Sequence, residues 1–314
     1  MAYKGENVAA QNNSTSTPSL ETSPRTILIG AALTLAGGSL WGINATISKM
    51  LMADYGVTPL WLSCVRELGA CVLFFACAAA TSPKQLAGAL TDARSWPKYI
   101  GCALICVLMV QIAYLCSINV TNSGTATVLQ SLNLLFVLLF TCIMARRLPS
   151  KREAIGVILA FAGTVLIATG GDLTSLALPA EGLLWGLLNA ASTSALPILP
   201  VMLMRRWGSF AINGIMFLVS GLVLLPVVKP WSNPPALDAR GWAMMAFTVV
   251  LGTFGAYWLF LMGSRMAGAM RATMLGTAEP VMATISAVLL TGVLFTPTDL
   301  VGFALIVAMV FLVR

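Results

Sequence analysis

Runs of about twenty apolar residues recur along the whole chain of 314 residues, and no other feature constrains the fold as strongly. A helix needs roughly 20 apolar residues to cross the hydrocarbon core of a bilayer. Ten segments approach that length, with bounds at about 27–52, 58–80, 98–119, 122–144, 152–169, 180–204, 210–228, 241–263, 267–291 and 298–313. The sequence therefore predicts an all-α, polytopic membrane protein of ten transmembrane helices.

The charge content agrees with a chain surrounded by lipid. Only 9% of the residues are charged and 58% are hydrophobic, whereas a soluble domain has about 25% charged residues. Residues 1–25 are polar and rich in Ser, Thr and Asn, so we expect a disordered cytoplasmic tail there. This segment has no apolar core before a cleavage site and is not expected to be a signal peptide.

The basic residues lie mostly in alternate connections, which indicates the orientation. If the N-terminus is cytoplasmic, the opposite side holds few basic residues, namely Lys49, Lys229 and Arg240. The cytoplasmic side then holds Lys4, Arg25, Lys84, Arg94, Lys98, Arg146, Arg147, Lys151, Arg152, Arg205, Arg206, Arg265, Arg271 and Arg314. The positive-inside rule predicts an inner-membrane protein with both termini in the cytoplasm. The net charge of +7 is then a topology signal, and no nucleic-acid partner is expected.

The chain contains no histidine, and none of its seven cysteines forms a CxxC motif. The usual general base, the Ser-His and Cys-His nucleophile pairs and His-ligated metal sites are therefore excluded. The chain also lacks GxSG and GxGD motifs and a pair of intramembrane aspartates, which disfavours the alternative of an intramembrane enzyme. We expect no catalytic residue, no cofactor and no metal. Cys102 and Cys106 share a helix face, and packing is favoured over soft-metal binding.

The two halves of the chain resemble each other. At an offset of 146, "ATVLQSLNLLF" (126–136) falls on "ATMLGTAEPVM" (272–282), and "SLWGINA" (39–45) resembles "LLWGLLNA" (183–190). The basic residues of the connection at 146–152 are absent from the second copy. Five spans per half force the halves, 26–170 and 171–314, into opposite orientations. Inverted repeats of five plus five spans are typical of transporters with a midplane site between the halves.

Several short motifs appear in a recognisable order along these spans. They are Trp41-Gly42 with Lys49 eight residues after the tryptophan, Pro59 and Arg66 in the second span, and Glu279-Pro280 in the ninth. With the duplication, they make residues 27–313 resemble the drug/metabolite transporter superfamily, specifically its EamA-type ten-helix exporters. The fourth span departs from the family pattern, because "SLNLLF" stands where a proline is common.

The resemblance implies a transporter that exports small metabolites by alternating access. Within the family the chain most resembles bacterial exporters of aromatic and other neutral amino acids. Cationic drugs, nucleosides and sugar conjugates remain alternative substrates. The expected partners are a small-molecule substrate, the lipid bilayer and, as a candidate coupling ion, the proton. A membrane receptor or scaffold would not need an inverted repeat.

Glu279 and Pro280 lie side by side within the ninth span. Pro280 has no N–H, so we expect the carbonyl of Gly276 to lose its helical partner and the helix to break. A broken helix presents polar groups to a midplane site, and at the repeat offset Glu279 faces Asn133. Glu279 is expected to bind a substrate amine or to carry a coupling proton. The alternatives are a structural ion pair with Arg66 or a capped helix break.

Two polar stripes and several aromatic residues are further candidates for the substrate cavity. The stripes are Trp41, Asn44 and Ser48 in the first span and Trp185, Asn189 and Ser192 in the sixth, where Pro197 and Pro200 predict a kink. The other aromatic candidates are Tyr114, Tyr257 and Trp258. Asn and Ser within spans also serve helix–helix contacts, and Tyr and Trp also favour the membrane interface.

Overall fold

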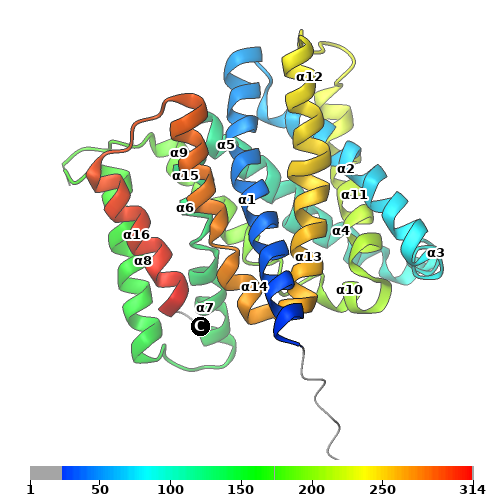
Figure 1. The fold of residues 1–314 in the computed structure, drawn as a ribbon, viewed down its shortest axis with the longest axis horizontal. Helices are drawn as coiled ribbons and strands as arrows, with labels where there is room; N and C mark the ends of the chain where they lie inside the picture. The colour runs from blue at the N-terminus through cyan, green and yellow to red at the C-terminus, as the bar shows by residue number, and fades with distance from the viewer. Residues whose placement is uncertain (1–22, 173, 313–314) are drawn as a thin grey trace, which may run out of the picture.

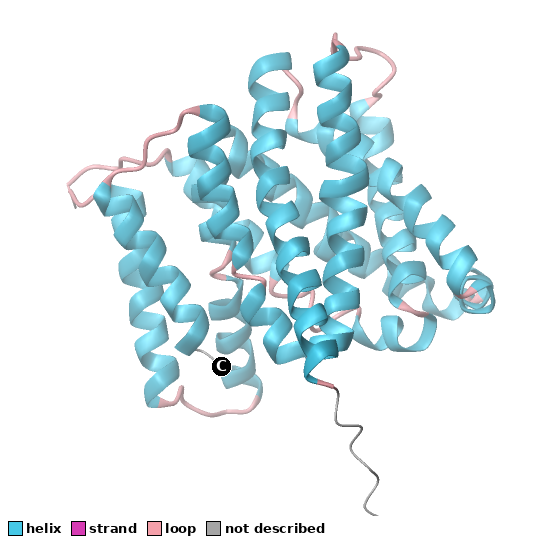
Figure 2. Cartoon of the chain, viewed as in Figure 1, coloured by secondary structure: helices cyan, strands magenta, loops and turns pink. Residues whose placement is uncertain are grey.

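The computed structural model describes residues 23–172 and 174–312, and within them every regular element is a helix (Figure 2). In chain order these elements are α1 (Pro24–Tyr55), α2 (Pro59–Thr81), α3 (Pro83–Thr91), η1 (Ala93–Ser95), α4 (Trp96–Ala103), η2 (Leu104–Met109), α5 (Val110–Val120), α6 (Ser123–Gln130), α7 (Asn133–Met144), α8 (Lys151–Thr169), α9 (Ala180–Thr193), α10 (Val201–Trp207), α11 (Ser209–Val228), α12 (Ala239–Ala246), η3 (Phe247–Gly255), α13 (Ala256–Ala267), α14 (Ala269–Leu275), α15 (Ala278–Thr291) and α16 (Pro297–Leu312). The tail predicted for residues 1–25 falls almost entirely outside the described residues.

The prediction of an all-α polytopic membrane protein is confirmed. Seven helices within the described ranges are long and apolar enough to cross a membrane. The remaining predicted spans are α9 with α10, α14 with α15, and α16. The short helix α3 was not predicted, because its nine residues are too few to give an apolar span.

The packing relates the two halves of the chain. α2 packs on α11 and α8 packs on α16, so these two pairs each join one half to the other (Figure 1). α1 lies against α13 and α15, while α9 lies against α5, α6 and α7. In the repeat, α1 corresponds to α9, α13 to α5, and α14 with α15 to α6 with α7. The contacts of α1 therefore match those of α9, as an inverted repeat requires.

The local irregularities also recur in both halves. The third span contains the wide, π-helical segment η2, and the eighth contains η3. The fourth span is interrupted between α6 and α7, and the ninth between α14 and α15. Such interruptions are tolerated in a membrane only where they are buried in protein or line a cavity.

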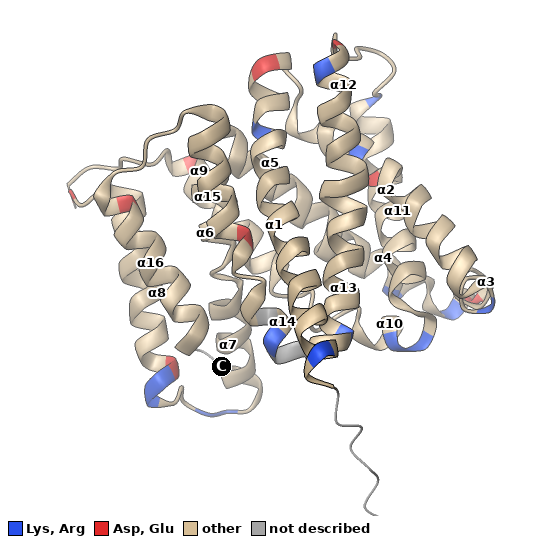
Figure 3. Ribbon diagram, in the orientation of Figure 1, with Lys and Arg blue, Asp and Glu red and all other residues tan. Residues whose placement is uncertain are grey.

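The charged residues mark the two ends of the bundle. Figure 3 shows most Lys and Arg residues at the end where α1 begins, while several acidic residues lie at the opposite end. The last described turn of α16 lies at the same basic end as the start of α1 (Figure 1). This distribution agrees with the loop asymmetry in the sequence.

Candidate functional site

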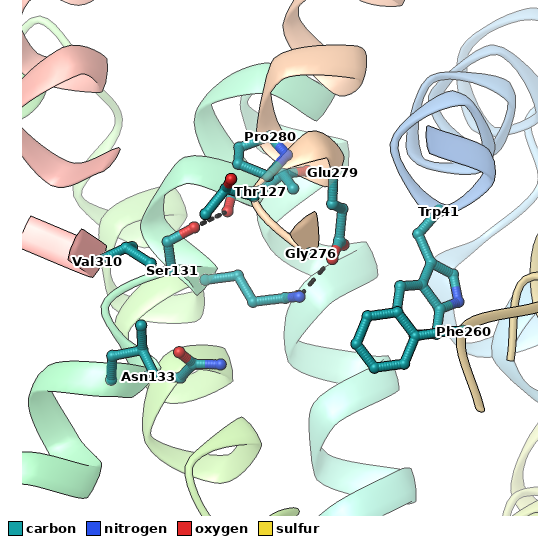
Figure 4. A pocket seen from close by; sticks show the side chains of 12 residues that line it. Trp41, Thr127, Ser131, Asn133, Phe260, Gly276, Glu279, Pro280 and Val310 are labelled. Atoms are coloured by element: carbon teal, nitrogen blue, oxygen red, sulfur yellow. Dashed lines mark hydrogen bonds between the residues drawn. The ribbon is translucent and has the colours of Figure 1, made fainter. Parts of the chain in front are cut away.

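A cavity of about 160 Å³ lies where the two interrupted spans meet (Figure 4). Its described lining has one carboxyl group, several neutral polar side chains and two aromatic side chains. The lining residues are Trp41, Thr127, Gln130, Ser131, Asn133, Leu134, Phe260, Gly276, Thr277, Glu279, Pro280 and Val310. They come from α1, α6, α7, α13, α15 and α16 and from the two interruptions, so both halves of the chain build the cavity.

The interruption of the ninth span brings Glu279 to the cavity. α14 ends at Leu275 and α15 begins at Ala278, so Pro280 lies in the first turn of α15, where a missing N–H is tolerated. The expectation of a free Gly276 carbonyl is wrong, because the backbone N–H of Glu279 donates to it over 3.0 Å. A tight turn satisfies this carbonyl at the break.

The fourth span breaks at the corresponding place without a proline. α6 ends at Gln130, and the N–H of Ser131 donates to the carbonyl of Val128 over 3.0 Å. α7 then begins at Asn133. Tight turns therefore interrupt both spans, and the departure from the family pattern at "SLNLLF" does not keep the fourth span straight.

Glu279 lies at the end of a directed hydrogen-bond chain. Gln130 Nε2 donates to Glu279 Oε1 over 3.3 Å, and Asn189 Nδ2 donates to Gln130 Oε1 over 2.9 Å. Thr193 Oγ1 donates to Asn189 Oδ1 over 3.1 Å. Every donor in the chain points toward the carboxylate, and successive bonds of this kind polarise one another. Asn189 therefore orients the amide of Gln130 so that its Nε2 faces the Glu279 carboxyl.

Gln130 is a site residue that the sequence analysis missed. It is the glutamine of "VLQSLN" in the repeat comparison, and it falls opposite Gly276 of the second copy. Because the two residues differ, the similarity of the two halves does not indicate this position. An amide inside an apolar span was the available signal, because such a group needs hydrogen-bond partners.

An aromatic wall lies beside the carboxylate. The rings of Trp41 and Phe260 lie 5.0 Å apart between centroids, and Trp41 also contacts Tyr257 edge-on at 5.0 Å. Figure 4 shows Trp41 and Phe260 on one side of the cavity and Ser131 and Asn133 on the other, with Glu279 near the middle. A cation is attracted both by a carboxylate and by aromatic ring faces.

Arg66 and Glu279 do not form the ion pair that the sequence left open. Arg66 donates to Gln111 of α5, while the partner of Glu279 is Gln130. Arg66 is buried on α2 and does not line the cavity. The ion pairs among the described residues are Arg147–Glu153, Arg206–Asp92 and Arg240–Asp54, each with an exposed arginine.

Three of the predicted residues lie directly behind the cavity wall. The Tyr114 hydroxyl bonds the hydroxyl of Thr127 over 2.8 Å. Asn189 bonds Gln130, as described above, and Tyr257 packs against Trp41. These residues can orient the side chains that line the cavity without themselves contacting a bound substrate.

Other predicted residues do not line the cavity. Asn44 packs against Gly252 of η3, and Ser48 and Ser192 are buried elsewhere in α1 and α9. Trp185 Nε1 donates to Glu181 Oε1 of its own helix over 3.2 Å. Trp258 is 41% exposed. It follows Tyr257 directly and therefore projects about 100° away from it around the helix.

The sixth span is also broken, near its two prolines. α9 ends at Thr193, turns fill 194–200, and α10 begins at Val201. The kink predicted from Pro197 and Pro200 is a full interruption, in which the N–H of Leu196 donates to the carbonyl of Thr193 over 3.1 Å. The interruption lies between Asn189, with its hydrogen bonds to Gln130 and Thr193, and the basic end of the span.

Comparison with known proteins identifies the relatives of this chain. The profile of the EamA-like transporter family matches residues 28–169 and again 180–314. The chain is 26% identical over 279 residues to the "uncharacterized inner membrane transporter YicL" of Salmonella typhimurium, covering 89% of this chain and 93% of the relative. It is 24% identical over 275 residues to the "uncharacterized transporter YwfM" of Bacillus subtilis, covering 86% and 88%.

A solved crystal structure has the same fold. It aligns with 92% of this chain and 96% of its own, with a TM-score of 0.63 and 17% sequence identity.

Proposed function

The chain belongs to the EamA-like transporter family and is a membrane transporter rather than an enzyme, and we propose that it exports small metabolites that carry an amine. Aromatic and other neutral amino acids are the favoured substrates. The observation that carries the proposal is the Glu279 carboxylate in a cavity walled by Trp41 and Phe260. This combination suits an ammonium group attached to an apolar or aromatic body.

The two ends of a zwitterion would find different partners in the cavity. Its ammonium would bind Glu279, and its side chain would lie against Trp41 and Phe260. Its carboxylate would lie at the N-terminal end of α7, beside Ser131 and Asn133. Interrupted helices in transporters commonly place such positive helix ends toward anionic groups.

Hydrogen bonds join three spans on the side of the cavity opposite the basic end. Thr46 Oγ1 lies 2.6 Å from Ser286 Oγ and 2.8 Å from Ser123 Oγ, and these bonds join α1, α15 and α6. A Cβ atom at Gly42 would collide with the backbone carbonyl of Glu279, so α1 and α15 are in backbone contact. We propose that the protein is closed to the outside here, and that export separates this contact.

The location and orientation follow the same premise. One relative is described as an inner-membrane transporter, and we propose the same membrane for this chain. We also propose that the basic end in Figure 3 faces the cytoplasm, as the positive-inside rule requires. Both described ends of the chain would then be cytoplasmic.

Cationic compounds without a carboxylate are a second candidate substrate class. The observation that favours them is that no Lys or Arg stands among the described residues that line the cavity. A simple organic cation needs only Glu279 and the aromatic wall, whereas an amino acid also needs a site for its carboxylate.

Counterflow in proteoliposomes distinguishes the two classes. Labelled phenylalanine, leucine and methionine are compared with phenethylamine, which keeps the ring and the ammonium of phenylalanine but lacks the carboxylate. We expect exchange of the amino acids and weaker exchange of the amine. Exchange of phenethylamine without exchange of phenylalanine would establish the cationic class, and exchange of neither would refute both.

A further inference from the structure

A fully buried carboxyl lies outside the cavity. Glu67 on α2 is 0% exposed, and its carboxyl oxygens have no hydrogen-bond partner among the described residues. The hydroxyls of Ser63 on α2 and Ser220 on α11 face this carboxyl. Within the same described ranges, both hydroxyls are fully buried and unpartnered. A carboxyl and two hydroxyls therefore lie together, buried between α2 and α11.

Among the described residues, Arg66 is the cation that acts on Glu67, but the two side chains form no ion pair. Arg66 projects about 100° away from Glu67 around the helix and donates to Gln111. The other ionisable neighbour is the thiol of Cys64, also on α2. An ionised side chain within a span is costly, because the surrounding lipid and apolar side chains cannot solvate its charge.

The elements packed against α2 present neutral groups here. α11 presents the Ser220 hydroxyl, and η3 places Val249 against Gly69. α5 presents Tyr114, with Gln111, toward Arg66. α3 carries Lys84, which is exposed beyond the end of α2.

A bound proton satisfies these groups. A neutral carboxylic acid has one O–H donor and a carbonyl acceptor. Its O–H can donate to one serine hydroxyl, and its carbonyl can accept from the other. An ionised carboxylate would be a buried charge without an ion-pair partner, because the Arg66 guanidinium donates to Gln111.

We propose that Glu67, with Ser63 and Ser220, is a proton-binding site of this transporter, an inference that rests on the transport function proposed above. Ser63 and Glu67 belong to the first five spans, and Ser220 belongs to the second five. Alternating access moves one half against the other and therefore changes the α2–α11 interface. In one conformation the proton stays on the carboxyl, and in another it passes to water as the interface opens.

Infrared spectroscopy of the purified protein in lipid, titrated with acid and base, detects this proton without any substrate. We expect the carbonyl band of a protonated carboxylic acid in the wild type. Glu67→Gln should lose it, and Glu181→Gln, which changes an exposed carboxyl, should keep it. Ser220→Ala should shift the band, because the carboxylic acid loses a hydrogen-bond partner. This variant replaces Glu67→Gln as the test if Glu67→Gln fails to fold. A full, unshifted band in Glu67→Gln or Ser220→Ala would overturn the proposal.

Transport gives a second readout. With one proton per substrate, a gradient of one pH unit supports about tenfold accumulation. We expect the ratio of flux with and without the gradient to fall to one in Glu67→Gln and to stay at the wild-type value in Glu181→Gln. A ratio unchanged in Glu67→Gln would overturn proton coupling at this site. If no tested solute is transported, the proposed function fails, while the infrared result still decides whether Glu67 binds a proton.

Discussion

Gln130 and Glu279 lie 149 positions apart in the chain, yet the side-chain amide of Gln130 donates to Glu279 Oε1 over 3.3 Å. The bond joins the last residue of α6 to the first turn of α15. It therefore connects the interrupted spans of the two halves at the cavity. Asn189 of α9 supports Gln130 from behind, so three spans hold the orientation of one carboxylate.

Replacement of Gln130 by leucine should weaken substrate binding. The change keeps a side chain of similar size but removes the donor to Glu279, and a hydrogen bond to a charged group contributes about 1.5–3 kcal/mol. We expect the half-saturation concentration for counterflow of phenylalanine to rise about tenfold or more. Gln85→Leu, on the exposed surface of α3, is the matched control. Equal half-saturation concentrations in the two variants would remove Gln130 from the site.

The close contact of α1 with α15 predicts a different kind of defect. A Cβ at Gly42 would meet the backbone of Glu279 and Ala283, which cannot move aside as a flexible side chain can. Overpacking of this kind costs about 1–3 kcal/mol. We expect Gly42→Ala to lower the midpoint of thermal unfolding in detergent. Gly101→Ala is the control, because a Cβ there meets nothing within 4 Å, and an equal midpoint in both variants would contradict the contact.

The orientation of the two halves can be tested by labelling single cysteines in a background without the seven native ones. Cysteines at Lys84, Ser150 and Arg205 should react with an impermeant reagent from the cytoplasmic side. Cysteines at Tyr55, Ser175 and Thr298 should react from the outside. Position 150 directly precedes α8, and position 298 lies at the start of α16, the equivalent span of the second half. Labelling of both positions from one side would refute the inverted repeat.

The sequence predicts local features of this fold better than long-range ones. Apolar runs define the spans because each span must satisfy its own backbone, and Gly276 with Pro280 indicates where the ninth span breaks. The side-chain partners depend on how helices rotate when they pack. Arg66 was a candidate partner for Glu279, but its rotation on α2 directs it to Gln111 instead.

The same limit applies to the aromatic residues. Tyr257 and Trp258 were both expected at the cavity, but neighbours on a helix face different ways, and only Tyr257 packs against Trp41. The Gln130–Asn189 bond spans 59 positions, and no periodicity in the sequence indicates it. The stripes on the first and sixth spans therefore predicted polar positions, whereas the structure decides which of them reach the cavity.

Glu279→Gln separates the role of Glu279 from that of Glu67. The substitution keeps the shape of the side chain and an oxygen that can accept from Gln130, but it removes the negative charge that would bind an ammonium group. Loss of a charged partner costs roughly 1.5–3 kcal/mol, so we expect the half-saturation concentration for phenylalanine to rise about tenfold or more at every pH tested.

The response to a pH gradient should distinguish Glu279 from Glu67. If Glu279 binds the amine and Glu67 binds the proton, the residual flux of Glu279→Gln keeps the wild-type ratio with and without the gradient. Glu67→Gln should show the reverse pattern, in which the ratio is lost. A Glu279→Gln protein with normal substrate affinity but no response to the gradient would assign the proton to Glu279 and refute its role as the amine site. Asn133→Ala is the matched cavity control, because it changes a lining residue without removing a charge and should leave the ratio unchanged.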